Sequence, residues 1–180
     1  MEVRKTQDMT VTAVMAAVLC CLGPLTIQIG PIPVTLANLG VMLAAYVLGR
    51  KRSAAAVGLY LLIGLVGLPV FSGFQGGPQK LLGPTGGFLA GYLLLAFIAG
   101  WCIDRWPESR LAGAAGLLAG EVVLYILGTA WFVFQAGTGV GEALALCVYP
   151  FLAVDAAKVV AATAVGPVLR AAVRKSGALD

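Results

Sequence analysis

Basic residues gather in four clusters that divide this chain into three long apolar blocks. The clusters lie at residues 4–5, 50–52, 105–110 and 170–175, and the blocks between them have about equal lengths. Charged residues make up only 11% of the 180 residues, and hydrophobic residues make up 60%. Soluble domains carry about 25% charged residues. The pattern therefore predicts an all-α integral membrane protein, with residues 1–180 forming a single membrane domain.

A weakly charged segment interrupts each apolar block near its middle, so each block predicts a helical hairpin and the chain predicts six transmembrane helices. The positive-inside rule places all four basic clusters, and with them the N- and C-termini, in the cytoplasm. Pro150 falls near the start of the last span, where a proline is tolerated or kinks the helix. The approximate spans are 9–25, 34–48, 53–70, 84–101, 111–134 and 144–172.

Two opposite charges, Asp155 and Lys158, lie within the last predicted span at a spacing that puts them on one helix face. A charge at the centre of a membrane helix costs about 2.5–3.5 kcal/mol on insertion scales. The pair is typical of a cavity that binds a polar ligand; the alternative is an ion pair that locks two helices together. Glu121 lies in the middle of another span and is a second cavity residue, a proton carrier or a structurally bonded carboxyl.

The segment 73–87 is rich in glycine and contains Lys80, the one base predicted on the outer side. It either folds over a cavity or simply turns the chain, and Lys80 is the candidate contact for an anionic ligand. The chain has no histidine and no phosphate-binding G-x-x-x-x-G-K-[ST] motif. No His-based catalysis or zinc site is therefore possible. We expect neither an enzyme nor a cofactor, and the spread of the bases gives no reason to expect nucleic acid.

Small residues recur at a spacing that lets membrane helices approach closely. Glycines at the ends of segments 87–91 and 116–120 predict packing between helices of the same chain. Ala13 and Ala17 give the first helix a smooth face, which either packs internally or docks another membrane protein.

Four motifs follow one another along the chain: Gly-Pro-Ile-Pro-Val-Thr-Leu at 30–36, Gly-Leu-Pro-Val-Phe at 67–71, Leu-Gly-Pro-Thr-Gly-Gly-Phe at 82–88, and Asp155-x-x-Lys158. Together these motifs resemble the BioY family. One departure is Ala37-Asn38, where many members have Gln-Thr. BioY proteins are the biotin-binding S components of energy-coupling factor (ECF) vitamin transporters.

The resemblance implies a six-helix, ECF S-component-like bundle in the bacterial cytoplasmic membrane, which captures its substrate without an ATPase of its own. Its implied partners are biotin, the membrane coupling (T) subunit and two cytoplasmic ATPase subunits. Ala13 and Ala17 match the surface on which the family docks the coupling subunit.

The chemistry of biotin suits the charges of the last span. We expect Asp155 to accept an N–H of the ureido ring and Lys158 to donate to its carbonyl. Biotin is longer than the ~5–6 Å between neighbours on a helix face, so other groups must meet its carboxylate. The candidates are Lys80, Gln79 and backbone N–H groups near Gly86, and the candidate wall residues are Asn38, Gln28, Trp131 and Tyr149.

Two other functions fit the same sequence. In the first alternative, the chain is an S component or a small solitary transporter for a different vitamin or organic acid. In the second, it is a non-transport membrane protein, either an intramembrane enzyme or an assembly factor. Ligand binding separates the first alternative from a biotin protein, and the missing histidine argues against most versions of the second.

Overall fold

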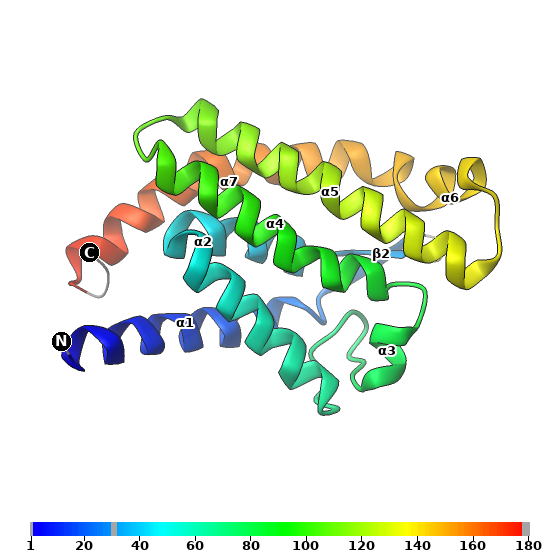
Figure 1. The fold of residues 1–180 in the computed structure, drawn as a ribbon, viewed down its shortest axis with the longest axis horizontal. Coiled ribbons are helices and arrows are strands. Elements are labelled where there is room, and N and C mark those ends of the chain that lie inside the picture. The colour runs from blue at the N-terminus through cyan, green and yellow to red at the C-terminus, as the bar shows by residue number, and fades with distance from the viewer. Residues whose placement is uncertain (1, 30–31, 178–180) are drawn as a thin grey trace.

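The computed structural model describes residues 2–29 and 32–177, and in this part of the chain it is a bundle of helices with one short β-hairpin (Figure 1). The prediction of a mainly helical protein is confirmed. The elements are α1 (Glu2–Leu22), β1 (Thr26–Ile29), β2 (Ile32–Thr35), α2 (Leu36–Leu65), α3 (Pro78–Leu82), α4 (Gly86–Arg105), α5 (Arg110–Ala136), α6 (Val140–Cys147) and α7 (Tyr149–Lys175).

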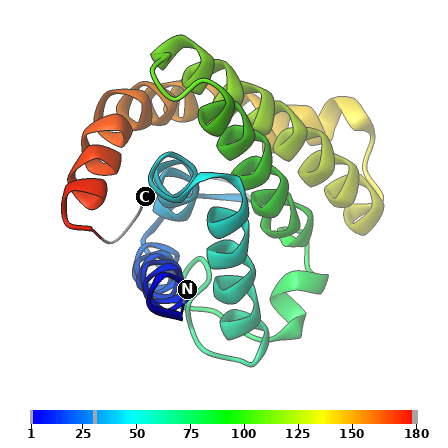
Figure 2. The same ribbon diagram turned by 60° about the vertical axis from the view of Figure 1, so that its left-hand side comes forward.

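Helix α2 consists of two halves that meet at Gly49, where the second half turns back from the first (Figures 1 and 2). Gly49 has φ 70° and ψ −178°, a conformation that glycine adopts far more easily than other residues. The backbone N–H of Arg50 donates to Oδ2 of Asp104 in α4 at 2.9 Å. The break therefore falls at the second basic cluster, and a carboxylate from a neighbouring helix satisfies the freed backbone group.

The segment between the predicted spans 9–25 and 34–48, which interrupts the first apolar block, contains β1 and the start of β2, and the two strands pair antiparallel. Thr26 pairs with Thr35 and Ile29 pairs with Ile32. Thr, Ile and Val suit strands because their branched side chains pack well on a pleated surface. Gly30 and Pro31, which open the first of the four motifs, lie outside the described residues.

The last predicted span, 144–172, contains two helices, α6 and α7, and the break between them falls just before Pro150, where a kink was one of the two expectations. Val148, at φ −123° and ψ −59°, separates the two helices. The physical reason is Pro150, which lacks a backbone N–H and whose ring would collide with the carbonyl four residues earlier in a continuous helix. Proline is instead tolerated in the first turn of a helix, and Pro150 occupies that place in α7.

Within residues 2–29 and 32–177, three helices are long and apolar enough to cross a membrane by length and composition, namely α4, α5 and α7. Residues 6–22 of α1 form a shorter apolar helix. The basic cluster 50–52 lies at the break inside α2, so each half of this helix is shorter than the roughly 20 residues of a typical membrane span. The chain is therefore a multi-helix membrane protein.

Close packing of α4 against α5 confirms the prediction that their glycines serve intramolecular contact. A Cβ added at Gly91 would lie 2.7 Å from Leu124 Cδ1, and one added at Gly120 would lie 2.6 Å from Leu95 Cδ1. Any side chain at these positions would force the two helices apart.

The ends of the bundle differ in composition. In Figure 1 both termini, the turn inside α2 and the connection between α4 and α5 lie towards the left. The β-hairpin, α3 and α6 lie towards the right. The four basic clusters belong to the first end, which we call the basic end, and the opposite end carries the glycine-rich segment that includes α3.

Candidate ligand-binding site

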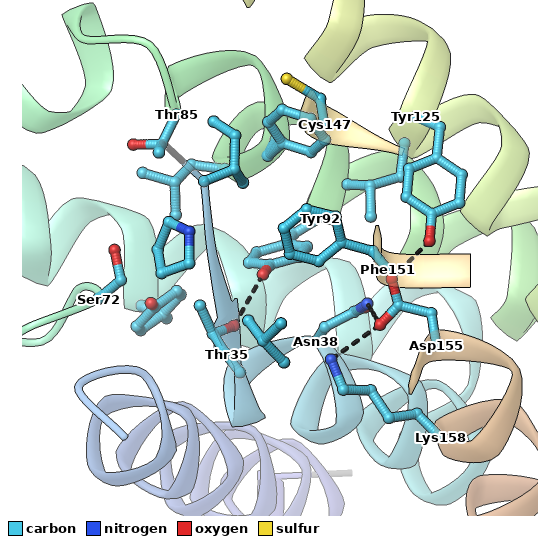
Figure 3. A pocket seen from close by; sticks show the side chains of 18 residues that line it. Thr35, Asn38, Ser72, Thr85, Tyr92, Tyr125, Cys147, Phe151, Asp155 and Lys158 are labelled. Atoms are coloured by element: carbon cyan, nitrogen blue, oxygen red, sulfur yellow. Dashed lines mark hydrogen bonds and ion pairs between the residues drawn. The ribbon is translucent and has the colours of Figure 1, made fainter. Parts of the chain in front are cut away.

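A cavity lies among β2, the first turn of α2, α4, α5 and α7, and we call it the ligand cavity (Figure 3). Its free space is about 50 Å³, which is room for a few water molecules. Small-molecule pockets usually have about 300–1,000 Å³, so the ligand cavity in this structure is smaller than a typical pocket. Its lining residues are Ile32, Pro33, Val34, Thr35, Ala37, Asn38, Tyr60, Ser72, Thr85, Phe88, Leu89, Tyr92, Leu124, Tyr125, Cys147, Phe151, Asp155 and Lys158.

Asp155 and Lys158 both line the ligand cavity from α7, as the spacing in the sequence suggested. Lys158 Nζ donates to Asp155 Oδ1 at 2.8 Å, and the two residues are only 8% and 5% exposed. One turn of helix therefore presents an anion and a cation side by side, away from water. Such a pair offers both an acceptor and a donor to a polar ligand.

Asn38 joins this pair to a second carboxyl group, that of Glu121. Figure 3 shows the bond between Asn38 and Asp155. Its Nδ2 donates to Asp155 Oδ1 at 3.3 Å and to Glu121 Oε1 at 2.6 Å. Glu121 does not line the ligand cavity but lies behind Asn38, and its Oε2 has no hydrogen-bond partner in the described part of the chain. Asn38 Oδ1 has no hydrogen-bond partner among the described residues. That oxygen is an unused acceptor beside the ion pair.

Tyr125 completes the cluster, and the sequence reading did not select it. Its hydroxyl donates to Asp155 Oδ2 at 2.5 Å, so both carboxylate oxygens of Asp155 are engaged. The available signal was its position four residues after Glu121, which places both on one face of α5. We call Asn38, Glu121, Tyr125, Asp155 and Lys158 the buried polar cluster.

Aromatic and apolar side chains form the remaining wall of the ligand cavity. Phe88 and Tyr92 come from α4 and Phe151 comes from α7. The Tyr92 hydroxyl lies 3.1 Å from Thr35 Oγ1, which ties α4 to β2. Flat apolar surfaces beside a polar cluster suit a ligand that has a polar ring system and an aliphatic portion.

Lys80 and Gln79 lie outside the ligand cavity and line a neighbouring cavity of about 450 Å³, which we call the outer cavity. Thr85 lines both cavities. Lys80 Nζ donates to Gln75 Oε1 at 2.8 Å, and burial lowers the pKa of the Lys80 ammonium. The outer cavity is lined by Gln75, Gly76, Gln79, Lys80, Gly83, Pro84 and Thr85.

The structure places four other candidates away from the ligand cavity. Trp131 Nε1 donates to the Gly83 carbonyl at 2.8 Å and so fastens α5 to the turn before α4. The Gly86 N–H donates to the same carbonyl at 3.0 Å. Tyr149 is 63% exposed, and Gln28 is exposed on β1.

These observations define a helical membrane protein with an internal cavity, which is lined by four residues of the buried polar cluster on one side and by largely apolar side chains elsewhere. The model of the BioY family matches residues 1–175. The biotin transporter BioY2 of Lactococcus lactis is 35% identical over 166 residues, which cover 92% of this chain and 91% of that protein. The biotin transporter BioY of Thermotoga maritima is 41% identical over 138 residues, which cover 77% of this chain and 80% of that protein. The chain belongs to the BioY family.

The fold agrees with this assignment. The crystal structure of the S-component for biotin from an ECF-type ABC transporter matches with a TM-score of 0.85. The two proteins are 27% identical, and the match covers 94% of each chain.

Proposed function

We propose that this chain is the biotin-capturing S component of an ECF-type vitamin transporter in the cytoplasmic membrane. The observation that carries the proposal is the buried polar cluster, because it supplies an acceptor and a donor inside an apolar cavity. Membership of a family whose named relatives are biotin transporters supports the choice of ligand.

The polar cluster matches the ureido ring of biotin group by group. Asp155 accepts one ureido N–H, and Lys158 donates to the ureido carbonyl. The free Oδ1 of Asn38 is an acceptor for the second N–H. The apolar part of biotin packs against Phe88 and Phe151. Desolvated, charge-assisted hydrogen bonds of this kind are stronger than neutral ones.

Biotin needs more space than the ligand cavity now has, so binding widens it. The walls nearest the glycine-rich end are β2 and the segment containing Ser72 and Thr85. These are short or irregular elements, which move at a smaller free-energy cost than packed helices do. Entry from this end brings biotin past the outer cavity, which shares Thr85 with the ligand cavity.

Lys80 and Gln79 meet the biotin carboxylate in this proposal, with Lys80 exchanging its bond to Gln75 for the ligand. Lys80→Glu should then weaken the binding of biotin but leave that of a neutral biotin amide unchanged. Calorimetry with both ligands checks this expectation. Equal weakening of the two would remove Lys80 from the site.

Six membrane crossings with both termini in the cytoplasm make up the topology of the proposal. The gathering of both termini and all four basic clusters at the basic end supports it (Figure 1). The two halves of α2 are then two short crossings that pack against longer neighbours, and α6 with α7 forms the last one.

The proposed partners are a membrane coupling subunit and two cytoplasmic ATPases. Ala13 and Ala17 are exposed on α1, while Ala16 and Leu19 on its other side are buried. A smooth exposed face of small residues suits close packing against a helix of another membrane protein. Ala13→Trp should therefore reduce co-purification of the coupling subunit, whereas Val165→Trp on the exposed face of α7 should not. Equal effects of both would contradict docking on α1.

Titration of the purified chain with biotin tests the function itself. One-to-one binding of biotin, with no heat from other water-soluble vitamins, is the expected result. Binding of a different vitamin or organic acid instead would favour an S component or solitary transporter of that specificity. A folded protein that binds none of them would favour a non-transport function.

A further inference from the structure

A second polar cavity lies at the basic end of the bundle, and its lining residues include none of those that line the ligand cavity. Its free space is about 300 Å³. Five of its eight lining residues are basic, and they come from the break in α2 and from the last turns of α7. We call it the basic cavity, and it is lined by Val47, Leu48, Arg50, Lys51, Arg52, Asp104, Arg170 and Arg174.

The charges around the basic cavity do not balance. Asp104 is its one acidic lining residue, and it already accepts hydrogen bonds from the Arg50 backbone at 2.9 Å and from Arg170 Nη2 at 3.1 Å. Arg52 also pairs with Asp8 at 2.9 Å. Among the described residues, five cations therefore share two carboxylates, which leaves an excess of three positive charges around the cavity.

Arg170 shows the imbalance at the level of single atoms. Its side chain is 13% exposed, and its Nη2 holds Asp104. Its Nε and Nη1 are buried and have no hydrogen-bond partner among the described residues. An unsatisfied buried donor on a charged group is costly. A planar guanidinium is well suited to bind a phosphate, and a local shift of the buried Arg170 side chain would bring these two nitrogens to one.

We propose that the basic cavity binds the phosphate group of an anionic phospholipid. A lipid is the source that fits the position, because the cavity lies where the membrane helices end on their basic side. Basic pockets between membrane helices on the cytoplasmic side suit anionic head groups. Val47 and Leu48, which are buried, form the apolar inner wall of the basic cavity. The choice of leaflet rests on the topology given under the proposed function.

Native mass spectrometry of the detergent-purified chain, titrated with phosphatidylglycerol and with phosphatidylcholine, tests this site. Wild-type protein should bind phosphatidylglycerol at least about tenfold more tightly, since both lipids carry the phosphate but phosphatidylcholine adds a trimethylammonium cation, which the basic lining residues repel. The double variant Arg50→Gln/Arg174→Gln should lose this preference. The matched control Arg105→Gln/Lys175→Gln removes the same charge outside the cavity and should keep it.

Three results would overturn the proposal. Wild-type protein that binds both lipids equally has no anionic-lipid site. If both double variants lose the preference for phosphatidylglycerol to the same extent, the lipid is held by diffuse attraction to a basic surface. Displacement of phosphatidylglycerol by millimolar inorganic phosphate would identify free phosphate as the ligand. Biotin titration of each variant reports folding and the proposed function separately, so a failure of the lipid site leaves that result standing.

Discussion

The buried polar cluster and the basic cavity differ in how their charged groups are paired. In the cluster Lys158 and Asp155 bond to each other, and Asn38 and Tyr125 satisfy more of the carboxylate oxygens. Around the basic cavity, cations outnumber carboxylates and Arg170 keeps two unused nitrogens.

Access to water explains the difference. Inside the bundle an unpaired charge costs several kcal/mol, so each ionised group needs a fixed partner. At the end of the bundle, water and salt weaken repulsion between like charges. Fixed partners hold the cluster ready for one small ligand, whereas an excess of cations can attract an anion from outside. The comparison predicts larger effects for substitutions in the cluster than for those at the basic end.

Lys158→Met should have the largest effect on stability. It leaves the Asp155 carboxylate buried without its cation, and breaking a buried pair from one side costs about 3–5 kcal/mol. Thermal unfolding in detergent should show a strongly lowered midpoint.

The matched control is the double variant Asp155→Asn/Lys158→Met, which removes both charges. It should recover much of the lost stability while still failing to bind biotin. If Lys158→Met unfolds at the wild-type temperature, the pair is not desolvated as described.

Tyr125→Phe should have an intermediate effect. The variant keeps the ring but removes the hydroxyl that donates to Asp155 Oδ2, and loss of a hydrogen bond to a buried charged group costs about 1–3 kcal/mol. Unfolding midpoint and biotin affinity should both fall. Tyr149→Phe, at an exposed tyrosine of α7, should change neither. A Tyr125→Phe protein indistinguishable from that control would exclude Tyr125 from the cluster.

The Asp8–Arg52 pair at the basic end should contribute least. The two side chains are 42% and 32% exposed, and exposed ion pairs contribute about 0–1 kcal/mol. A double-mutant cycle with Asp8→Asn and Arg52→Gln measures the coupling. A coupling energy well above 1 kcal/mol would contradict the contrast between the two regions.

Local periodicity was sufficient to predict part of the cluster from the sequence. Asp155 and Lys158 are three residues apart on one helix, so their shared face follows from helix geometry alone. The contacts of Asn38 and Tyr125 with Asp155 were harder to predict from the sequence. Both residues reach Asp155 from other helices, and only tertiary packing brings them there.

The same geometry explains why two aromatic candidates lie elsewhere. Tyr149 precedes Asp155 by six residues, and Trp131 follows Tyr125 by six. At about 100° per residue this separation turns a side chain to a different face of the helix. The basic clusters, in contrast, lie at the ends of α1, α4, α5 and α7 and at the break inside α2, because basic residues gather where membrane segments reach the cytoplasmic surface.

The most direct test of the account compares the biotin affinity of Asp155→Asn with that of Asp104→Asn. Each variant removes one carboxylate that pairs with a cation, the first in the ligand cavity and the second in the basic cavity. We expect calorimetry to show no detectable binding for Asp155→Asn and wild-type affinity for Asp104→Asn. Biotin binding that survives Asp155→Asn in a folded protein would contradict the central claim and leave the Asp155–Lys158 pair as a link between helices.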